Sequence, residues 1–225
     1  FWTDLRASIP PAAQREQALL QGVPAPAQPV DISFPSGIEL SAAAQDSSGA
    51  AGPDNCSAQE IKYLPLDVFN TVSTLFKMFA AAKEAPQQLR QSRMVCLPKG
   101  GKIQSYSVKT ADTRPISAMS VWWRLWSSTI CRGAPLRAWL RSTLSAQVGG
   151  ISGDDIYVNI IEIFDSFHQH GFLLTMDYSK AFDCLDSSLS CRLLQAHGWP
   201  SALVDLLAAT WDRQERFVQW DHHIH

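Results

Sequence analysis

The sequence predicts an α+β fold whose β-sheet is incomplete within these 225 residues. Apolar residues recur at helical spacing in several segments, and short apolar runs between those segments are typical of strands. The predicted order of elements is α-β-αα-α-β-αα-β, with no internal repeat and no glycine-rich phosphate-binding loop. Such a mixed order indicates an α+β domain.

The composition is that of a globular chain, because 46% of the residues are hydrophobic. No stretch approaches the run of about 18 apolar residues that spans a membrane, and the N-terminus lacks the layout of a signal peptide. We therefore expect an intracellular protein with no membrane partner. The five cysteines are scattered without CxxC spacing, which favours reduced thiols over disulfides or a zinc site. The start at Phe1 and the end at His225 indicate that both ends are cuts.

The first 60 residues differ in composition from the rest of the chain. Residues 1–60 are rich in Ala, Pro, Gln, Ser and Gly and show little hydrophobic periodicity. This composition predicts a low-complexity, disordered linker. Residues 61–225 are expected to form the folded domain.

The first predicted helix lies in LPLDVFNTVSTLFKMFAAAKEAP, with Asp67 as its N-terminal cap and Pro86 after its end. Its core-facing side is predicted from five apolar residues at helical spacing: Val68, Val72, Leu75, Phe76 and Phe79. The run RMVCLP at residues 93–98 is a predicted strand, followed by the turn KGGK and a loop.

Two more helices are predicted at residues 120–131 and 135–144, with a break at residues 132–134. The first of them carries three tryptophans for which a core role is favoured over base stacking: Trp122, Trp123 and Trp126.

A further helix is predicted to open at GISGDD, with Asp154 as its cap, and to end near Gly171. The run GFLLTM that follows is predicted to be a strand buried on both faces. A helix capped by Asp186 and closed at His197-Gly198, a helix at residues 200–212 and a last strand ERFVQW complete the order.

Charge is unevenly distributed along the chain, although the net charge is only −2. Residues 91–141 contain nine Lys or Arg and one acid, whereas residues 154–186 contain seven acids and one Lys. A basic segment followed by an acidic one suits a site that holds a polyanion on one side and metal cations on the other. Two ordinary solvated faces would give the same pattern.

Three aspartates lie in the stretch MDYSKAFDCLD, which follows the apolar run GFLLT. Asp177 closes the predicted strand, so its carboxylate is expected at the rim of the sheet. Asp183 lies six residues later, and Asp186 is expected to cap the next helix. Taken alone, Asp177 is either a metal ligand or a structural aspartate at a strand end.

The stretch MDYSKAFDCLD, with the helix and HGWP after it, resembles the first carboxylate motif of reverse transcriptases of non-LTR retrotransposons and group II introns. Upstream, VCLPKGGK, TRPIS and LSAQVGGISGDD resemble motifs of the same family in the same order, although Asp154 stands where the family usually has an arginine. The resemblance extends from Tyr63 to Trp220. It implies a partial right-hand polymerase, with helical fingers and part of an antiparallel palm sheet.

The resemblance implies roles for individual residues in RNA-directed DNA synthesis. Asp177 would be a catalytic ligand of Mg²⁺, or of Mn²⁺, and the main-chain carbonyl of Tyr178 would be an auxiliary ligand. Phe182 would exclude ribonucleotides, and Lys99 and Arg114 would grip the triphosphate of the incoming dNTP, with Lys102 able to substitute for Lys99.

Ordinary structural roles remain open for the same residues. The two lysines could be solvated turn residues, Arg114 could pair with a surface acid, and Phe182 would pack against the sheet in either case.

The implied partners are an RNA template, a DNA primer and dNTPs, and the implied location is the nucleus. No feature of the sequence points to a specific protein partner. The family also uses an F/Y-x-D-D hairpin to complete its two-metal site, and these 225 residues contain none. We therefore expect the chain as given to be catalytically inactive. The alternatives are a non-catalytic module that binds nucleic acid and an unselected retroelement remnant.

Overall fold

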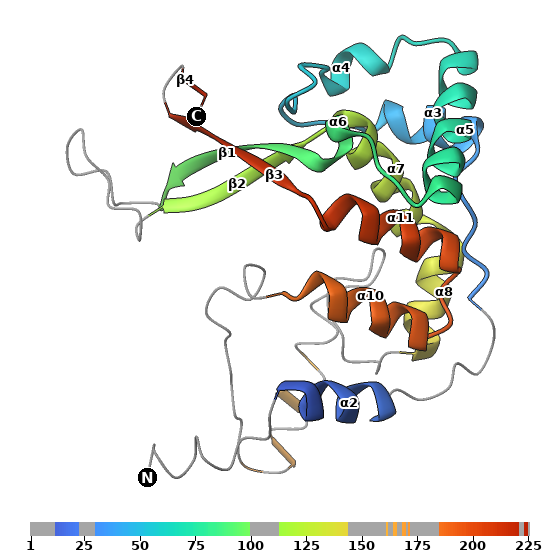
Figure 1. The fold of residues 1–225 in the computed structure, drawn as a ribbon, viewed down its shortest axis with the longest axis vertical. Helices are drawn as coiled ribbons and strands as arrows, with labels where there is room; N and C mark the ends of the chain where they lie inside the picture. Colours follow the sequence, from blue (N-terminus) through green and yellow to red (C-terminus); the bar gives the residue numbers. More distant parts are fainter. Residues whose placement is uncertain are drawn as a thin grey trace. The chain divides into compact units, whose positions relative to one another are not determined.

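The computed structural model has a mixed α+β fold, as the sequence predicts (Figure 1). It describes residues 12–22, 30–99, 113–143, 185–220 and 223–224, and a few single positions between 161 and 171. The chain divides into two units that each combine distant segments. One contains residues 1–32 and 131–204, and the other contains residues 33–130 and 205–225.

The larger unit contains a four-stranded sheet with the strand order β2-β1-β3-β4 (Figure 1). Its strands are β1 (Gln91–Pro98), β2 (Thr113–Met119), β3 (Glu215–Trp220) and β4 (His223–Ile224). β1 pairs antiparallel with β2 and parallel with β3, and β3 pairs antiparallel with β4. The sheet is therefore mixed, which differs from the antiparallel palm sheet that the resemblance implies. The parallel pairing is possible because the long connection between β1 and β3 provides the crossover that parallel strands need.

The strands at RMVCLP and ERFVQW are confirmed, but β2 lies where the sequence predicts a loop. Pro115 in the middle of β2 argues against a strand, because proline cannot donate a ladder hydrogen bond. Among the described strands β2 is an edge strand with β1 as its single neighbour, so one side of its backbone needs no partner. The edge position therefore accommodates the proline.

Helix α5 (Leu66–Ala82) confirms the first predicted helix, but its buried face is rotated from the predicted one and shares Phe76 with it. Its buried residues are Phe69, Ser73, Phe76 and Ala80, whereas Leu75 is 38% exposed. Both faces have helical spacing, and contacts with helix α3 (Gly37–Gln45) favour the observed one. Asp67 lies in the first turn without capping it, because Pro65 occupies the cap position.

Much of the predicted N-terminal linker is folded. Helices α2 (Ala12–Gly22), α3 and α4 (Ala58–Ile61) lie in it, and both α3 and α4 begin with a complete capping box. Leu40 and Ile61 are fully buried, and the Ser73 hydroxyl donates to the Pro35 carbonyl at 2.6 Å. The prediction of disorder is therefore wrong for residues 30–60. Composition alone indicates disorder here because the segment is rich in Ala and Ser. Its apolar side chains nevertheless pack against α5.

The main core of this unit is an aromatic cluster between α5 and helix α7 (Val121–Arg132). The Trp126 ring stacks on Phe76 with centroids 5.1 Å apart and on Trp123 with centroids 5.2 Å apart. Phe34 also contacts Trp126, with centroids 5.9 Å apart. The predicted core role is confirmed for Trp123 and Trp126, which are 5% and 2% exposed. Trp122 is partly exposed and contacts Phe69 edge-on.

Residues 50–54 contact the junction between β2 and α7 through hydrogen bonds and close backbone packing. The Asp54 carboxylate accepts a hydrogen bond from the Val121 N–H at 3.0 Å, at the start of α7. Gly52 lies so close to the Met119 backbone that a Cβ would overlap it, which explains the glycine at this position. The guanidinium groups of Arg93 and Arg124 donate to the carbonyls of Ala51 and Ala50.

The other unit contains α2, helix α8 (Ala134–Thr143) and helix α10 (Ser187–Ala196). Arg192 of α10 forms an ion pair with Glu16 of α2. Asp186 caps α10 by accepting from the Leu189 N–H at 3.0 Å, as predicted. The Trp139 ring of α8 makes an edge contact with the Trp199 ring, with centroids 5.5 Å apart.

The helices predicted near residues 120–131, 135–144 and 200–212 are confirmed as α7, α8 and helix α11 (Ser201–Trp211), and α6 (Gln87–Arg90) is a short additional turn. The strand predicted at GFLLTM lies outside the described residues. The same holds for most of the helix predicted after GISGDD, of which only single helical positions are described. Within the described ranges no helix is long and apolar enough to cross a membrane.

Candidate functional site

The hairpin of β1 and β2 carries two of the residues that the sequence singles out, Lys99 and Arg114. Lys99 directly follows Pro98, the last residue of β1, and Arg114 is the second residue of β2. The pairing places Thr113 opposite Pro98 and Arg114 opposite Leu97. Both cations therefore lie at the same end of the ribbon, where the two strands separate (Figure 1).

Strand geometry limits the separation of these two cations. Lys99 is two residues from Leu97, and Leu97 is the Cα partner of Arg114. With about 3.8 Å between consecutive Cα atoms and about 5.5 Å across a pair, the two Cα atoms lie within about 13 Å. Both side chains are exposed. Two long cationic side chains this close together can contact one polyphosphate.

Arg114 shares one face of the ribbon with two exposed aliphatic side chains. Leu97 and Ile116 are each 50% exposed, and the register puts Leu97 opposite Arg114 and Ile116 opposite Val95. Because alternate residues of a strand point to the same face, Leu97, Arg114 and Ile116 lie on one side of the sheet. A cation between apolar side chains suits a ligand with both charged and apolar parts, as a nucleotide has.

Arg114 forms no ion pair with an acid in the described part of the chain. The structural alternative for this residue, pairing with a surface acid, therefore finds no support there. Its guanidinium remains accessible from solvent.

The basic segment contributes less free charge than its composition indicates. Arg93 and Arg124 donate to the carbonyls of Ala51 and Ala50, so these two cations hold the chain in place. Counting charges along the sequence could not distinguish such residues from ligand-binding ones, because their partners lie more than 40 residues away. Lys99 and Arg114 are exposed at the hairpin end, so a ligand can reach both side chains from solvent.

The other predicted site residues lie outside the described residues: Lys102, Asp177, Tyr178 and Phe182. Their roles stay predictions. Among the residues that are described, no three His, Cys, Asp or Glu side chains gather where they could hold a metal ion.

Comparisons with known proteins identify no relative. No family model matches the sequence, and no curated protein matches it. The resemblance to reverse transcriptases therefore stays a prediction that rests on the sequence motifs alone.

Sequence reasoning missed the aliphatic neighbours of Arg114. Leu97 and Ile116 lie on the same exposed face because β2 pairs with β1 in this register. The sequence did not predict β2, because Pro115 argues against a strand. The paired glycines Gly100 and Gly101 after β1 are the available signal for a hairpin.

Proposed function

We propose that this chain is the fingers and the first part of the palm of a reverse transcriptase domain, which binds a template, a primer and a dNTP. The motif MDYSKAFDCLD carries the proposal, together with the fingers motifs that precede it in family order. The hairpin supports it, because the pairing of Leu97 with Arg114 brings Arg114 near Lys99, as joint binding of a triphosphate requires.

Arg114 and Lys99 would bind the triphosphate together, each through a different kind of contact. The Arg114 guanidinium can donate two parallel hydrogen bonds to phosphate oxygens, and Lys99 supplies a point charge. Lys102 would take over this role if it lies closer to the phosphates. The exposed Leu97 and Ile116 would pack against the apolar parts of the nucleic acid.

Asp177 is proposed to hold Mg²⁺ or Mn²⁺, with the Tyr178 main-chain carbonyl as a second oxygen ligand. Hard divalent cations prefer such oxygen ligands. When bound, the metal would supply electrostatic stabilisation at the reacting phosphate. Phe182 is proposed to lie against the sugar and to exclude a 2′-hydroxyl by its bulk.

We expect the 225-residue chain to bind an RNA–DNA primer-template hybrid but not to extend the primer. Binding follows from the exposed hairpin cations, and the absence of extension follows from the missing F/Y-x-D-D carboxylates. A gel-shift titration would measure binding, and primer extension with Mg²⁺ and dNTPs would measure synthesis. Extension of the primer would contradict the expected inactivity, and a failure to shift the hybrid would contradict the proposed function.

The second candidate function is a non-catalytic module that binds nucleic acid. The exposure of Lys99 and Arg114 favours it, because a polyanion needs only accessible cations. This candidate predicts hybrid binding that depends on the hairpin and is indifferent to Asp177→Ala. The polymerase-related proposal also predicts metal-dependent dNTP binding at Asp177.

A further inference from the structure

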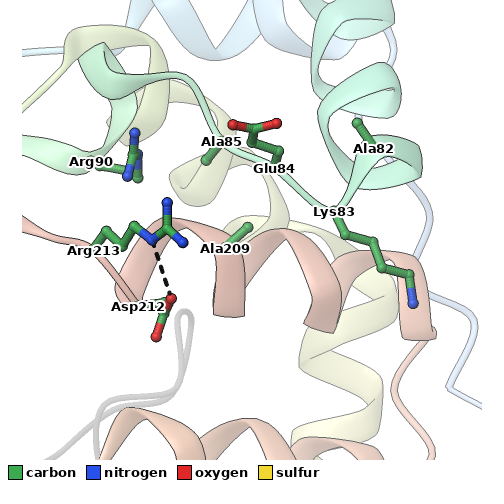
Figure 2. Close-up of a pocket in the computed structure, with 8 residues that line it drawn as sticks. All are labelled: Ala82, Lys83, Glu84, Ala85, Arg90, Ala209, Asp212 and Arg213. Atoms are coloured by element: carbon green, nitrogen blue, oxygen red, sulfur yellow. Dashed lines mark ion pairs between the residues drawn. The ribbon is translucent and has the colours of Figure 1, made fainter.

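The larger unit contains a hollow of about 330 Å³ (Figure 2). Its lining residue Arg90 directly precedes β1, whereas Lys99 directly follows the other end of that strand. Three cations line it, Lys83, Arg90 and Arg213, together with the acids Glu84 and Asp212. The sequence analysis assigns no binding role to any of these residues. The volume is at the lower limit of ordinary ligand pockets, which suits a small charged group.

Sheet pairing brings the two arginines together. Arg90 is the last residue of α6, directly before β1, and Arg213 lies between α11 and β3. β1 and β3 run parallel, with Gln91 opposite Glu215. The residues that precede the two strands therefore meet at the same end of the sheet. Figure 2 shows the Arg213 guanidinium between Arg90 and Ala209.

The guanidinium groups are poorly satisfied within the described chain. The Arg90 Nε is enclosed by protein and has no hydrogen-bond partner there. No protein acceptor therefore holds the Arg90 guanidinium through this nitrogen, and a phosphate in the hollow would contact the group through its other N–H groups. Arg213 contacts only Asp212 among the described acids, at 3.8 Å between Nε and Oδ2, and both side chains are more than three-quarters exposed. Such an exposed pair contributes little.

Lys83 and Glu215, two further charged groups near the arginines, have other partners. Lys83 forms an ion pair with Asp205 at 3.2 Å, and in Figure 2 its side chain points away from the two arginines. Glu215, near Arg90, accepts hydrogen bonds from Gln91 at 2.9 Å and Gln87 at 3.3 Å. Donation by Gln91 and then by Gln87 lowers the pKa of Glu215, with a smaller effect of Arg90. Glu84 lines the hollow without an ion pair to either arginine.

We propose that this hollow binds a phosphate group between Arg90 and Arg213. Two guanidinium forks can share the oxygens of one phosphate, and the bound anion would offset the repulsion between them. The phosphate would belong to a nucleic-acid backbone, which rests on the proposed function, or to a free phosphate compound. The eight residues of β1 span about 26 Å, so this site is separate from Lys99 and Arg114.

The test compares the wild-type chain with the double variant Arg90→Gln/Arg213→Gln. Calorimetric titration with pyrophosphate measures the free-phosphate form of the proposal, and fluorescence anisotropy with a single-stranded RNA across a salt series measures the backbone form. Loss of one phosphate contact is expected to lower RNA affinity about fivefold at 0.1 M salt. The slope of log affinity against log salt concentration should become shallower by about 0.7. If the site binds a free phosphate compound, the wild-type chain should release or absorb heat on titration with pyrophosphate, and the double variant should not.

Matched controls separate this site from net charge and from misfolding. Arg216→Gln removes one exposed cation from β3 without touching the hollow and should leave both readouts unchanged. Arg213→Gln alone changes an exposed side chain, keeps the fold, and should give a partial loss of the same readout. Unchanged binding of both ligands in the double variant, or an equal loss with Arg216→Gln, overturns the proposal. If substitutions of Lys99 and Arg114 weaken RNA binding and those of Arg90 and Arg213 do not, the proposed function stands and the proposed phosphate site in the hollow is rejected.

Discussion

Replacing Trp126 with alanine is expected to lower the free energy of unfolding by about 3–5 kcal/mol. Trp126 is 2% exposed and contacts three aromatic rings, those of Phe34, Phe76 and Trp123. Alanine would leave a large cavity between α5 and α7, because helices fixed by several other contacts cannot collapse into it. Chemical denaturation followed by tryptophan fluorescence and far-UV circular dichroism measures the change.

Trp122→Ala is the matched control for this prediction. Trp122 lies on the same helix but is partly exposed and contacts only Phe69 among the described aromatic rings. Its loss should cost less than half as much, because part of its surface already faces water. Equal losses for the two variants, or a loss below about 1 kcal/mol for Trp126→Ala, would contradict the packing of α5 against α7.

The double variant Lys99→Gln/Arg114→Gln is expected to bind a primer-template hybrid about 25- to 60-fold more weakly at 0.1 M salt. The reason is that each phosphate contact contributes about 0.7–0.9 to the slope of log affinity against log salt. The slope should therefore fall by about 1.4–1.8 when both contacts are removed. Fluorescence anisotropy at several salt concentrations measures both quantities.

The control for the hairpin is Lys77→Gln/Arg216→Gln, which removes two exposed cations from α5 and β3. The net charge changes equally in the two double variants, so any difference between them reflects position. Wild-type-like affinity is expected for the control. The hairpin would have no specific role if the control weakened binding as strongly as the hairpin variant.

Sequence patterns predicted the later helices well because their signals are local. Asp186 supplies a side-chain cap to α10, and Gly198 with φ +78° follows its end, as the residue types indicate. The glycine at position 133 separates α7 from α8 where the sequence places the break. Each of these features depends on residues within a few positions of one another.

The features that sequence reasoning missed depend on distant partners. The buried face of α5 was misassigned because α3 decides which side is covered, and α3 lies in a segment whose composition indicates disorder. β2 was missed because Pro115 is acceptable only on an edge strand. The structural use of Arg93 and Arg124 requires the carbonyls near residue 50, which no local pattern reveals.

The candidate site was predictable in part. The resemblance singled out Lys99 and Arg114, and the pairing of β1 with β2 adds that the two lie at one end of a ribbon. The hollow between Arg90 and Arg213 had no sequence signal, because its arginines come together only through the parallel pairing of β1 and β3.

The proposed relation to polymerases is tested most directly by the binding of Mn²⁺ in the presence of a dNTP, measured by electron paramagnetic resonance. If Asp177 is the metal ligand, Asp177→Ala should weaken Mn²⁺ binding by roughly tenfold or more, since a hard cation loses its only proposed carboxylate. Asp183→Ala, which removes the next acid along the chain, should bind Mn²⁺ as the wild type does. Equal Mn²⁺ binding by the wild type and Asp177→Ala would contradict the assignment of this chain to a nucleotide-polymerising family.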